Sequence, residues 1–191
     1  MLRLSRGSRS RYRARSPFDR QAMDFIAYGI ANGCDAMPLS SIYAYSNLFV
    51  GLRAAGALQQ LVAIYALAAP SEGWAKLNLV DPSTYPLTVN GTCTFTPFLG
   101  YTGDGSTGYI TNGATEAQLL LRNDSHIDVV VMAPPGGAQN NTISTGSAAG
   151  RTRLLAPRDA DPDVVVRLTA SADVTVSDVP LVGHFAADRS S

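Results

Sequence analysis

Residues 100–109 read GYTGDGSTGY, and four of these ten residues are glycine. The segment lies between two apolar runs, so it is a phosphate-binding loop, a sugar or calcium site, or a tight turn between strands. A P-loop requires a lysine after its last glycine, because that lysine reaches the phosphates, and no lysine follows here. A calcium loop requires several oxygen side chains at short spacing, and Asp104 alone is too few.

The glycines in this segment also match the GxGxxG spacing of a dinucleotide-binding loop. That loop opens a helix, whereas residues 109–111 are typical of a strand and no alternation of strands and helices surrounds them. An Asp-Gly pair favours the positive φ angles that tight hairpins require. The sequence therefore predicts a structural turn, formed by Gly103, Asp104, Gly105 and Gly108.

Helical periodicity dominates the chain before this turn. A first helix is expected to begin at Ser16-Pro17, where the serine caps and the proline occupies the first helical position, and to end at Asn32-Gly33. A second helix is expected from Ser40 or Ser41 to Ala55, with an apolar stripe at residues 42, 45, 48, 49 and 52. Residues 58–68 are expected to form a third helix or a buried segment. Residues 71–74, which include the single tryptophan, are expected to form a loop.

After Pro70 the chain becomes rich in Thr, Val, Gly and Asn. Strands are expected at residues 87–95, 109–111, 117–122, 127–132, 151–155, 164–169, 174–176 and 181–185, with a long polar loop at 134–146. Short strands with turn signals at this spacing are typical of a sandwich or barrel. The predicted fold class is α+β: a helical N-terminal region followed by a mainly antiparallel β-sandwich or small β-barrel.

The net charge of zero hides a division of charge along the chain. Residues 1–20 carry seven arginines and one acid, so a basic arm of +6 precedes a remainder of −6. The sequence therefore divides into a basic arm at 1–16 without fixed structure when free, a helical anchoring region at 17–70 and a β-rich domain at 71–191. The arginines proposed to bind a partner are Arg3, Arg6, Arg9, Arg11, Arg13 and Arg15.

Such an arm has three interpretations. Arginines form bidentate pairs with carboxylates, which favours docking onto an acidic protein surface. The arm can also contact the phosphates of DNA, or it can be a solvated tail. The sequence leaves these alternatives open, with docking as the preferred one.

The sequence carries no complete catalytic or metal-binding constellation. Ser, His and Asp are adjacent around His126, but a triad is built in space and not by adjacency, and no GxSxG or HExxH motif is present. The alternating acids at 159–163 lack the rest of a calcium loop. Cys34 and Cys93 are expected to be separate thiols, and zinc would have too few ligands. No enzyme activity, cofactor or metal is therefore predicted, and the longest apolar run, residues 61–69, is too short to span a membrane.

Three further stretches accompany the glycine-rich segment: NLFVGLRAAG at 47–56, the apolar residues of 57–69, and the Ser-Pro-Phe-Asp run at 16–19 that follows the arginines. In this order, and with GYTGDGSTGYITNG at 100–113, they resemble a family of tailed-phage and prophage virion structural proteins, with the head spikes of gene transfer agents as a related possibility. The resemblance covers residues 15–113. In that family a glycine-rich turn leads into a concanavalin A-like, β-rich region.

The resemblance implies a virion structural protein: a head fibre or spike base, a decoration protein, or a tail fibre adaptor. It implies assembly in the host cytoplasm with other virion proteins such as capsid, portal, fibre or tail subunits. A homo-oligomer, a trimer or pentamer, is expected. The alternative that the resemblance leaves open is a lectin-like module that binds a host surface polysaccharide.

Overall fold

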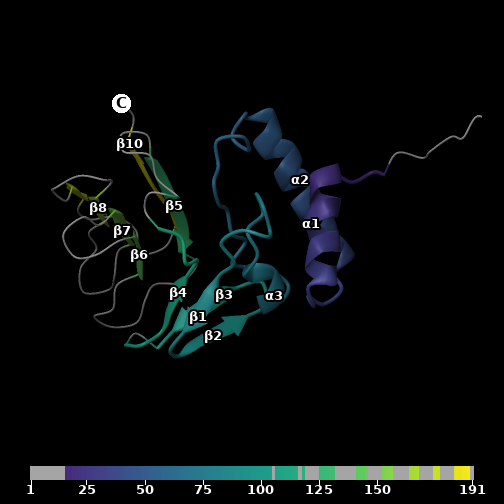
Figure 1. Ribbon diagram of the computed structural model, residues 1–191. Helices are drawn as coiled ribbons and strands as arrows, with labels where there is room; N and C mark the ends of the chain where they lie inside the picture. The colour runs from purple at the N-terminus through teal and green to yellow at the C-terminus, as the bar shows by residue number, and fades with distance from the viewer. Residues whose placement is uncertain are drawn as a thin grey trace, which may run out of the picture.

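The computed structural model describes residues 16–104, 106–115 and 118, together with strands at 125–131, 141–145, 152–156, 164–167, 174–176 and 183–189. Within these residues the protein combines helices with small antiparallel sheets, so the expected α+β class holds. Figure 1 shows helices α1 and α2 packed side by side, with α3 between them and the strands. The basic arm at 1–15 lies outside the described residues.

Helix α1 spans Arg20–Ala31 and begins later than the sequence suggests. Its N-cap is Asp19 and not Ser16, because the Asp19 carboxylate accepts hydrogen bonds from the backbone N–H groups of Gln21 and Ala22 at 2.9 and 3.2 Å. Arg53 fixes this carboxylate from the neighbouring helix, with 2.6 Å between Nη1 and Oδ2. The N-cap residue is thus determined by a tertiary contact with α2, and a local sequence pattern carries no information about such a contact.

Helix α2 spans Leu39–Ala54, close to the expected range, and the backbone leaves it through Gly56 with a φ of +69°. Its buried face differs from the expected apolar stripe. Tyr45 and Phe49 are buried as expected, but the two other buried residues of the helix are Ser41 and Ser46, while Leu48 is exposed. The Oγ of Ser46 accepts the Asp19 N–H at 2.7 Å, so this serine is buried to join the two helices.

No helix forms at residues 58–68, where the chain is irregular and its apolar residues Leu58, Ile64 and Ala66 pack against the core. The second expected alternative, a buried segment, is the one that is closer to the structure. The fully buried amide of Asn78 satisfies this backbone: its Oδ1 accepts from Ile64 N–H and Val80 N–H, and its Nδ2 donates to the Val62 carbonyl. One buried side chain thereby replaces the hydrogen bonds that a regular element would supply.

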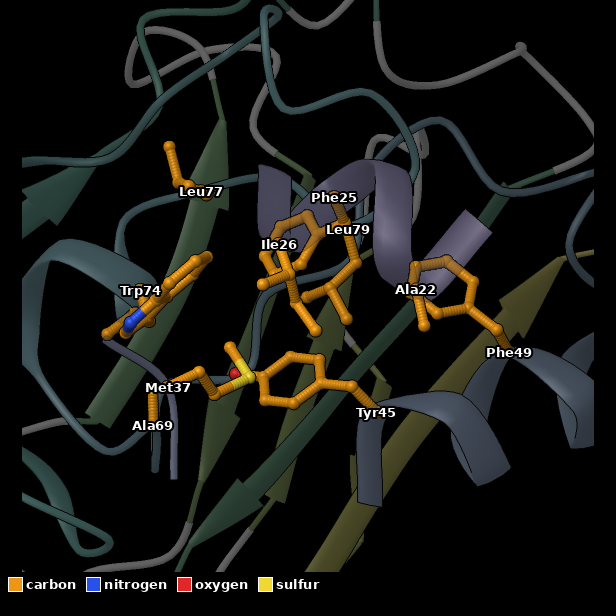
Figure 2. Packing of buried hydrophobic residues seen from close by; sticks show 11 residues of the cluster. Ala22, Phe25, Ile26, Met37, Tyr45, Phe49, Ala69, Trp74, Leu77 and Leu79 are labelled. Atoms are coloured by element: carbon orange, nitrogen blue, oxygen red, sulfur yellow. The ribbon is translucent and has the colours of Figure 1, made fainter. Parts of the chain in front are cut away.

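The expected loop at 71–74 is instead the short helix α3, Glu72–Ala75, which places Trp74 in the core. The indole N–H of Trp74 donates to the Asp35 carbonyl at 3.0 Å, and the ring lies 5.6 Å from that of Phe25 between centroids. Figure 2 shows the Trp74 ring among apolar side chains from both long helices and the following segment. The members of this core are Ala22, Phe25, Ile26, Met37, Tyr45, Phe49, Ala69, Trp74, Ala75, Leu77 and Leu79.

A two-stranded antiparallel ribbon follows the core. β1 (Thr88–Asn90) pairs with β4 (Tyr109–Thr111), and β2 (Cys93–Thr96) pairs with β3 (Gly100–Gly103). The expected strand at 87–95 is therefore two strands, β1 and β2. The glycine-rich segment at 100–109, expected to be a turn, begins instead with strand β3. The chain reverses at residues 97–99, between β2 and β3.

The later strands are also antiparallel. β5 (Ser125–Val131) pairs with β10 (Gly183–Arg189), and β6 (Asn141–Thr145), β7 (Thr152–Ala156), β8 (Val164–Arg167) and β9 (Val174–Val176) form one meander in that order. Four of them match expected strands within a few residues, and β9 matches in full. β6 is a strand inside the segment that was expected to be a polar loop. The strand expected at 117–122 falls outside the described residues, except for Gln118, which hydrogen-bonds in a turn with Thr115.

We expect opposite effects from two Gly→Ala substitutions in the long helices. A Cβ at Gly29 would lie 2.1 Å from the buried Trp74 ring, so Gly29→Ala should lower the free energy of unfolding by about 1–3 kcal/mol through overpacking. Gly51 of α2 has no atom within 4 Å of such a Cβ, so Gly51→Ala should raise it by about 0.5–1 kcal/mol. Urea unfolding followed by tryptophan fluorescence measures both. Equal effects of the two substitutions would contradict the close contact at Gly29.

Candidate functional site

The glycine-rich segment is an excursion in the ribbon and not the place where the ribbon reverses. Residues 104–108 separate β3 from β4, whereas only Gly91 and Thr92 separate β1 from β2 on the opposite side. The connection from β3 to β4 has more residues than the connection opposite it, so it must protrude from the pairing of the two chains. The expected tight hairpin at this place is replaced by a loop inserted into one edge of a longer hairpin. Gly105, one of the four predicted turn residues, lies outside the described residues.

The Asp104 side chain organises this loop. Its Oδ1 accepts from the backbone N–H groups of Ser106, Thr107 and Gly108 at 3.0, 2.8 and 2.8 Å, and its Oδ2 accepts the Thr107 hydroxyl at 2.6 Å. Hydrogen bonds from the Thr107 side chain and the loop backbone lower the pKa of this carboxyl well below its usual range. The carboxylate therefore accepts hydrogen bonds from the donors of its own loop and helps to fix the described part of that loop.

Glycine is required on both sides of the excursion. Gly91 has a φ of +63°, and a Cβ there would lie 2.1 Å from the Thr107 carbonyl oxygen. A Cβ on Gly108 would lie 2.4 Å from the carbonyl oxygen of Thr92. The two backbones approach each other too closely for any side chain. Gly91 and Gly108 therefore allow the two backbone segments to pack closely. The described residues of the loop make hydrogen bonds with one another.

The remaining candidates for chemistry are dispersed. Cys34 and Cys93 are free thiols, as expected, and partial burial raises the pKa of each. His126 lies in β5 and His184 in β10, where their backbone partners are Asp188 and Val130. Among the described residues no three His, Cys, Asp or Glu side chains come close enough to hold a metal ion. No helix of the described chain has the length and hydropathy of a membrane span.

A contrasting feature is an uncharged, apolar surface on α2 and on the turn between β2 and β3. Leu39, Tyr43, Leu48 and Val50 are exposed on the helix, although Ser41 and Ser46 are buried beneath it. Across residues 39–52 the helix has no charged side chain, and Arg53 at its end is engaged by Asp19. Its exposed side mixes these apolar residues with the polar, uncharged Ser40 and Asn47, so the helix carries no charged face between residues 39 and 52.

A groove of about 370 Å³ runs beside this helix. It is lined by one side of α2, by residues 66–70 and by the β2–β3 turn. Its lining residues are Ser40, Ser41, Ala44, Tyr45, Leu48, Ala66, Ala68, Pro70 and Phe98. None of them is charged. Phe98 and Leu99, at the tip of the turn, remain 55% and 64% exposed, so an apolar projection stands next to an apolar groove.

The sequence pattern does not reveal this surface. The apolar stripe of the helix places Leu48 in the core, and no element was assigned to the residues around 98. The signal that could have found it is the absence of charge throughout α2, where a surface helix normally carries charged residues on one face. The predicted arm residues, Arg3 to Arg15, lie outside the described residues.

Comparison of the chain with family models, with curated proteins and with solved structures finds no match.

We expect Gly91→Ala to destabilise the protein far more than Gly113→Ala. Both glycines have a positive φ, +63° and +67°, so the backbone strain of adding a side chain is matched. Only at Gly91 does the new methyl group meet a backbone carbonyl, and nothing lies within 4 Å of a Cβ at Gly113. Thermal unfolding should show a melting temperature several degrees lower for Gly91→Ala than for Gly113→Ala. Similar melting temperatures would contradict the close backbone approach.

The Asp104 carboxylate should make stability depend on acid. A carboxyl whose pKa is depressed in the folded state stabilises the fold above its unfolded pKa, near 4, and loses this contribution as the pH falls towards its folded pKa. Asp104→Asn should therefore melt below the unchanged protein at pH 7, and the difference should narrow progressively below about pH 4. Melting curves between pH 7 and pH 2 test this, and a difference that does not vary with pH would contradict it.

Proposed function

We propose that this chain is a structural subunit of a phage-like virion, such as a head fibre or spike base, a decoration protein, or a tail fibre adaptor. It acts by assembly and not by catalysis. The observation that carries the proposal is the uncharged apolar surface of α2 and the β2–β3 turn, where Phe98 and Leu99 are more than half exposed and Leu48 is partly exposed. Large exposed apolar patches mark places where another molecule binds.

The distribution of residues in α2 supports assembly more than a free monomer. Burying hydroxyl groups while leaving leucine and valine partly exposed gives up part of the ~1.5–3 kcal/mol that full burial of each such side chain contributes. A subunit recovers that free energy when its exposed helix face is covered in an assembly. The low charged fraction of the whole chain, 16%, points the same way, since interface cores are depleted in charge.

The described residues offer little support for an enzyme. Asp104 is hydrogen-bonded within its own loop, and the groove lining holds no carboxylate, histidine, cysteine or lysine. General acid–base chemistry and nucleophilic catalysis both require such groups to converge on a pocket. A function that uses shape and apolar contact suits this molecule better.

The proposed division of labour follows the chain. The helical region, with the basic arm before it, would anchor the subunit to capsid, portal, fibre or tail proteins, and the arginines would pair with acidic surfaces. The β-rich part would display a surface or hold the next component, and we propose that its strands close as a sandwich or small barrel. The antiparallel pairing of every described strand supports this arrangement.

A lectin-like role is the second candidate, and one observation favours it. Tyr109 is 60% exposed directly after the polar loop at 104–108, and an exposed aromatic ring beside hydroxyl groups can stack on a sugar. Surface polysaccharides of the host would be the ligand. A glycan array probed with the unchanged protein and with Tyr109→Ala tests it, because sugar stacking requires that binding be lost in the variant.

Deleting residues 1–15 should leave a folded protein that no longer joins particles. The described core contains no residue before Ala22, so the melting temperature should stay within a few degrees, whereas docking through arginines should be lost. Particles purified on a density gradient from the host that encodes the chain should contain the full-length protein and lack the truncated one. Quantitative mass spectrometry of the particle fraction measures this difference.

A matched control keeps the arm but changes its charge, with each of its six arginines replaced by glutamine. Loss of incorporation in both variants supports docking by charge, and loss only in the truncation points to a role for chain length. Unimpaired incorporation of the truncated protein would overturn the docking role. Absence of the full-length protein from particles would overturn the virion proposal itself, and retention of the protein only in DNA-filled particles would favour contact with nucleic acid.

A further inference from the structure

The chain contains three asparagine–glycine pairs, and all of them lie within the described residues: Asn32-Gly33, Asn90-Gly91 and Asn112-Gly113. An asparagine that precedes glycine is able to modify itself, because glycine has no side chain to shield its main-chain nitrogen. That nitrogen loses its proton to base in the solvent and attacks the side-chain Cγ of the asparagine. A cyclic imide forms, and the amide nitrogen leaves as ammonia. Water then opens the imide at either carbonyl, which gives aspartate or isoaspartate.

The reaction has two structural requirements at each pair. The N–H group of the glycine must be free to lose its proton, and the side chain of the asparagine must be free to turn towards it. A hydrogen bond that engages either group has to break first, and a typical hydrogen bond then slows the reaction by about twofold to tenfold. The chemistry of the three pairs is the same, so the hydrogen bonds around them rank their reactivity.

Asn32-Gly33 is the most protected pair. The Nδ2 of Asn32 donates to the Tyr28 carbonyl at 2.9 Å, and the Gly33 N–H donates to the Ile30 carbonyl at 3.2 Å. Asn32 is also the C-cap of α1, and its backbone N–H is bonded to the last turn of that helix. Both reacting groups are therefore held by the end of the helix, and this pair should react slowest.

Asn112-Gly113 is engaged at its attacking nitrogen. The Gly113 N–H donates to the Oγ1 of Thr111 at 3.1 Å. The Oδ1 of Asn112 accepts from the Ala114 N–H at 3.1 Å, so the side chain is held as well. Attack at this pair requires the first of these bonds to break, so it should be slower than attack by an unbonded nitrogen.

Asn90-Gly91 lacks this protection. Asn90 is the last residue of β1, and Gly91 follows outside the strand, where it is exposed. Among the described residues no group accepts a hydrogen bond from the Gly91 N–H. The Nδ2 of Asn90 donates to the Thr88 carbonyl at 3.3 Å, a longer contact than the 2.9 Å at Asn32. Of the three pairs, this is therefore the one whose attacking nitrogen is not engaged.

We propose that Asn90 is a site of spontaneous deamidation, at which the Gly91 nitrogen displaces ammonia and residue 90 becomes aspartate or isoaspartate. The proposal is independent of the virion role. Either product replaces a neutral amide with a carboxylate, and isoaspartate also adds a methylene group to the main chain. Only Gly91 and Thr92 join β1 to β2, and Gly91 packs directly against the Thr107 carbonyl. An added main-chain atom at this crowded place should loosen the ribbon, so the modification should lower stability as the protein ages.

The first test follows the purified full-length chain over days at mildly alkaline pH, which favours loss of the glycine proton. Chymotrypsin separates the pairs, because aromatic residues lie between them in the sequence. Mass spectrometry of the peptides detects each amide that has become a carboxyl group, and an isoaspartyl methyltransferase labels isoaspartate. Asn90 should react at least about fivefold faster than either Asn32 or Asn112, since only their attacking nitrogens must first break a hydrogen bond. A rate at Asn90 no higher than at the other two would overturn the proposal.

The same experiment in guanidinium chloride shows whether the fold sets this order. Unfolding removes the hydrogen bonds of all three pairs, so their rates should become similar. Folding should then slow Asn32 and Asn112 much more than Asn90. An order of rates that persists in the unfolded chain would overturn the structural argument, because local sequence alone would then explain it.

A matched variant, Asn90→Gln, tests the effect on the ribbon. Glutamine keeps the amide but would have to form a larger ring, so this site should stay unmodified during the incubation. The melting temperature of the unchanged protein should fall in step with the modified fraction at residue 90, and that of Asn90→Gln should hold over the same period. An equal fall in both proteins would overturn the expected loosening of the ribbon, while the peptide analysis would still report on the reaction itself.

Discussion

Contact between Trp74 and the backbone of α1 at Gly29 holds the described core together. The indole ring lies where a Cβ of residue 29 would be, so the helix and the ring approach as closely as the chain allows. Burying an aromatic side chain of this size contributes on the order of 4–6 kcal/mol. Since α3 is a single turn and the chain at 58–68 is irregular, this contact and the Asn78 hydrogen bonds position the segment that carries the groove.

The position of α2 follows from that constraint. Phe25 packs against both Tyr45 and Phe49, so α2 presents this side to the core, while Leu39 and Val50 are more than half exposed. The Ser46 hydroxyl and the Arg53 guanidinium then secure α2 to Asp19 at the start of α1. The same packing that stabilises the described core therefore leaves part of an uncharged helix exposed.

Local signals in the sequence predicted the extent of α2 and the positions of most strands, because glycine stops and β-branched runs act over a few residues. The sequence did not predict features that depend on contacts between residues far apart in the chain. Asp19 displaces Ser16 as the cap only because Arg53 and Ser46 reach it from another helix. Trp74 is buried only because Gly29 makes room for it. The polar strand β6 has the composition of a loop and forms by pairing with β7. The exposed residues of α2 were missed for the same reason, since the exposure of Leu48 depends on which side of α2 packs against Phe25 of α1.

The glycine-rich segment and the β2–β3 turn depart from regular structure in opposite ways. Around Asp104 the carboxylate and the described backbone donors of the loop satisfy one another, and glycine occupies the positions where the backbone is crowded, so the departure is accounted for within the subunit. At Phe98 a bulky apolar residue stands where glycine would be favoured and faces water, which costs about 1–3 kcal/mol of strain that the subunit does not recover. Unusual composition attracts notice to the first segment. The second segment has an ordinary composition, and only the positive φ of Phe98 sets it apart.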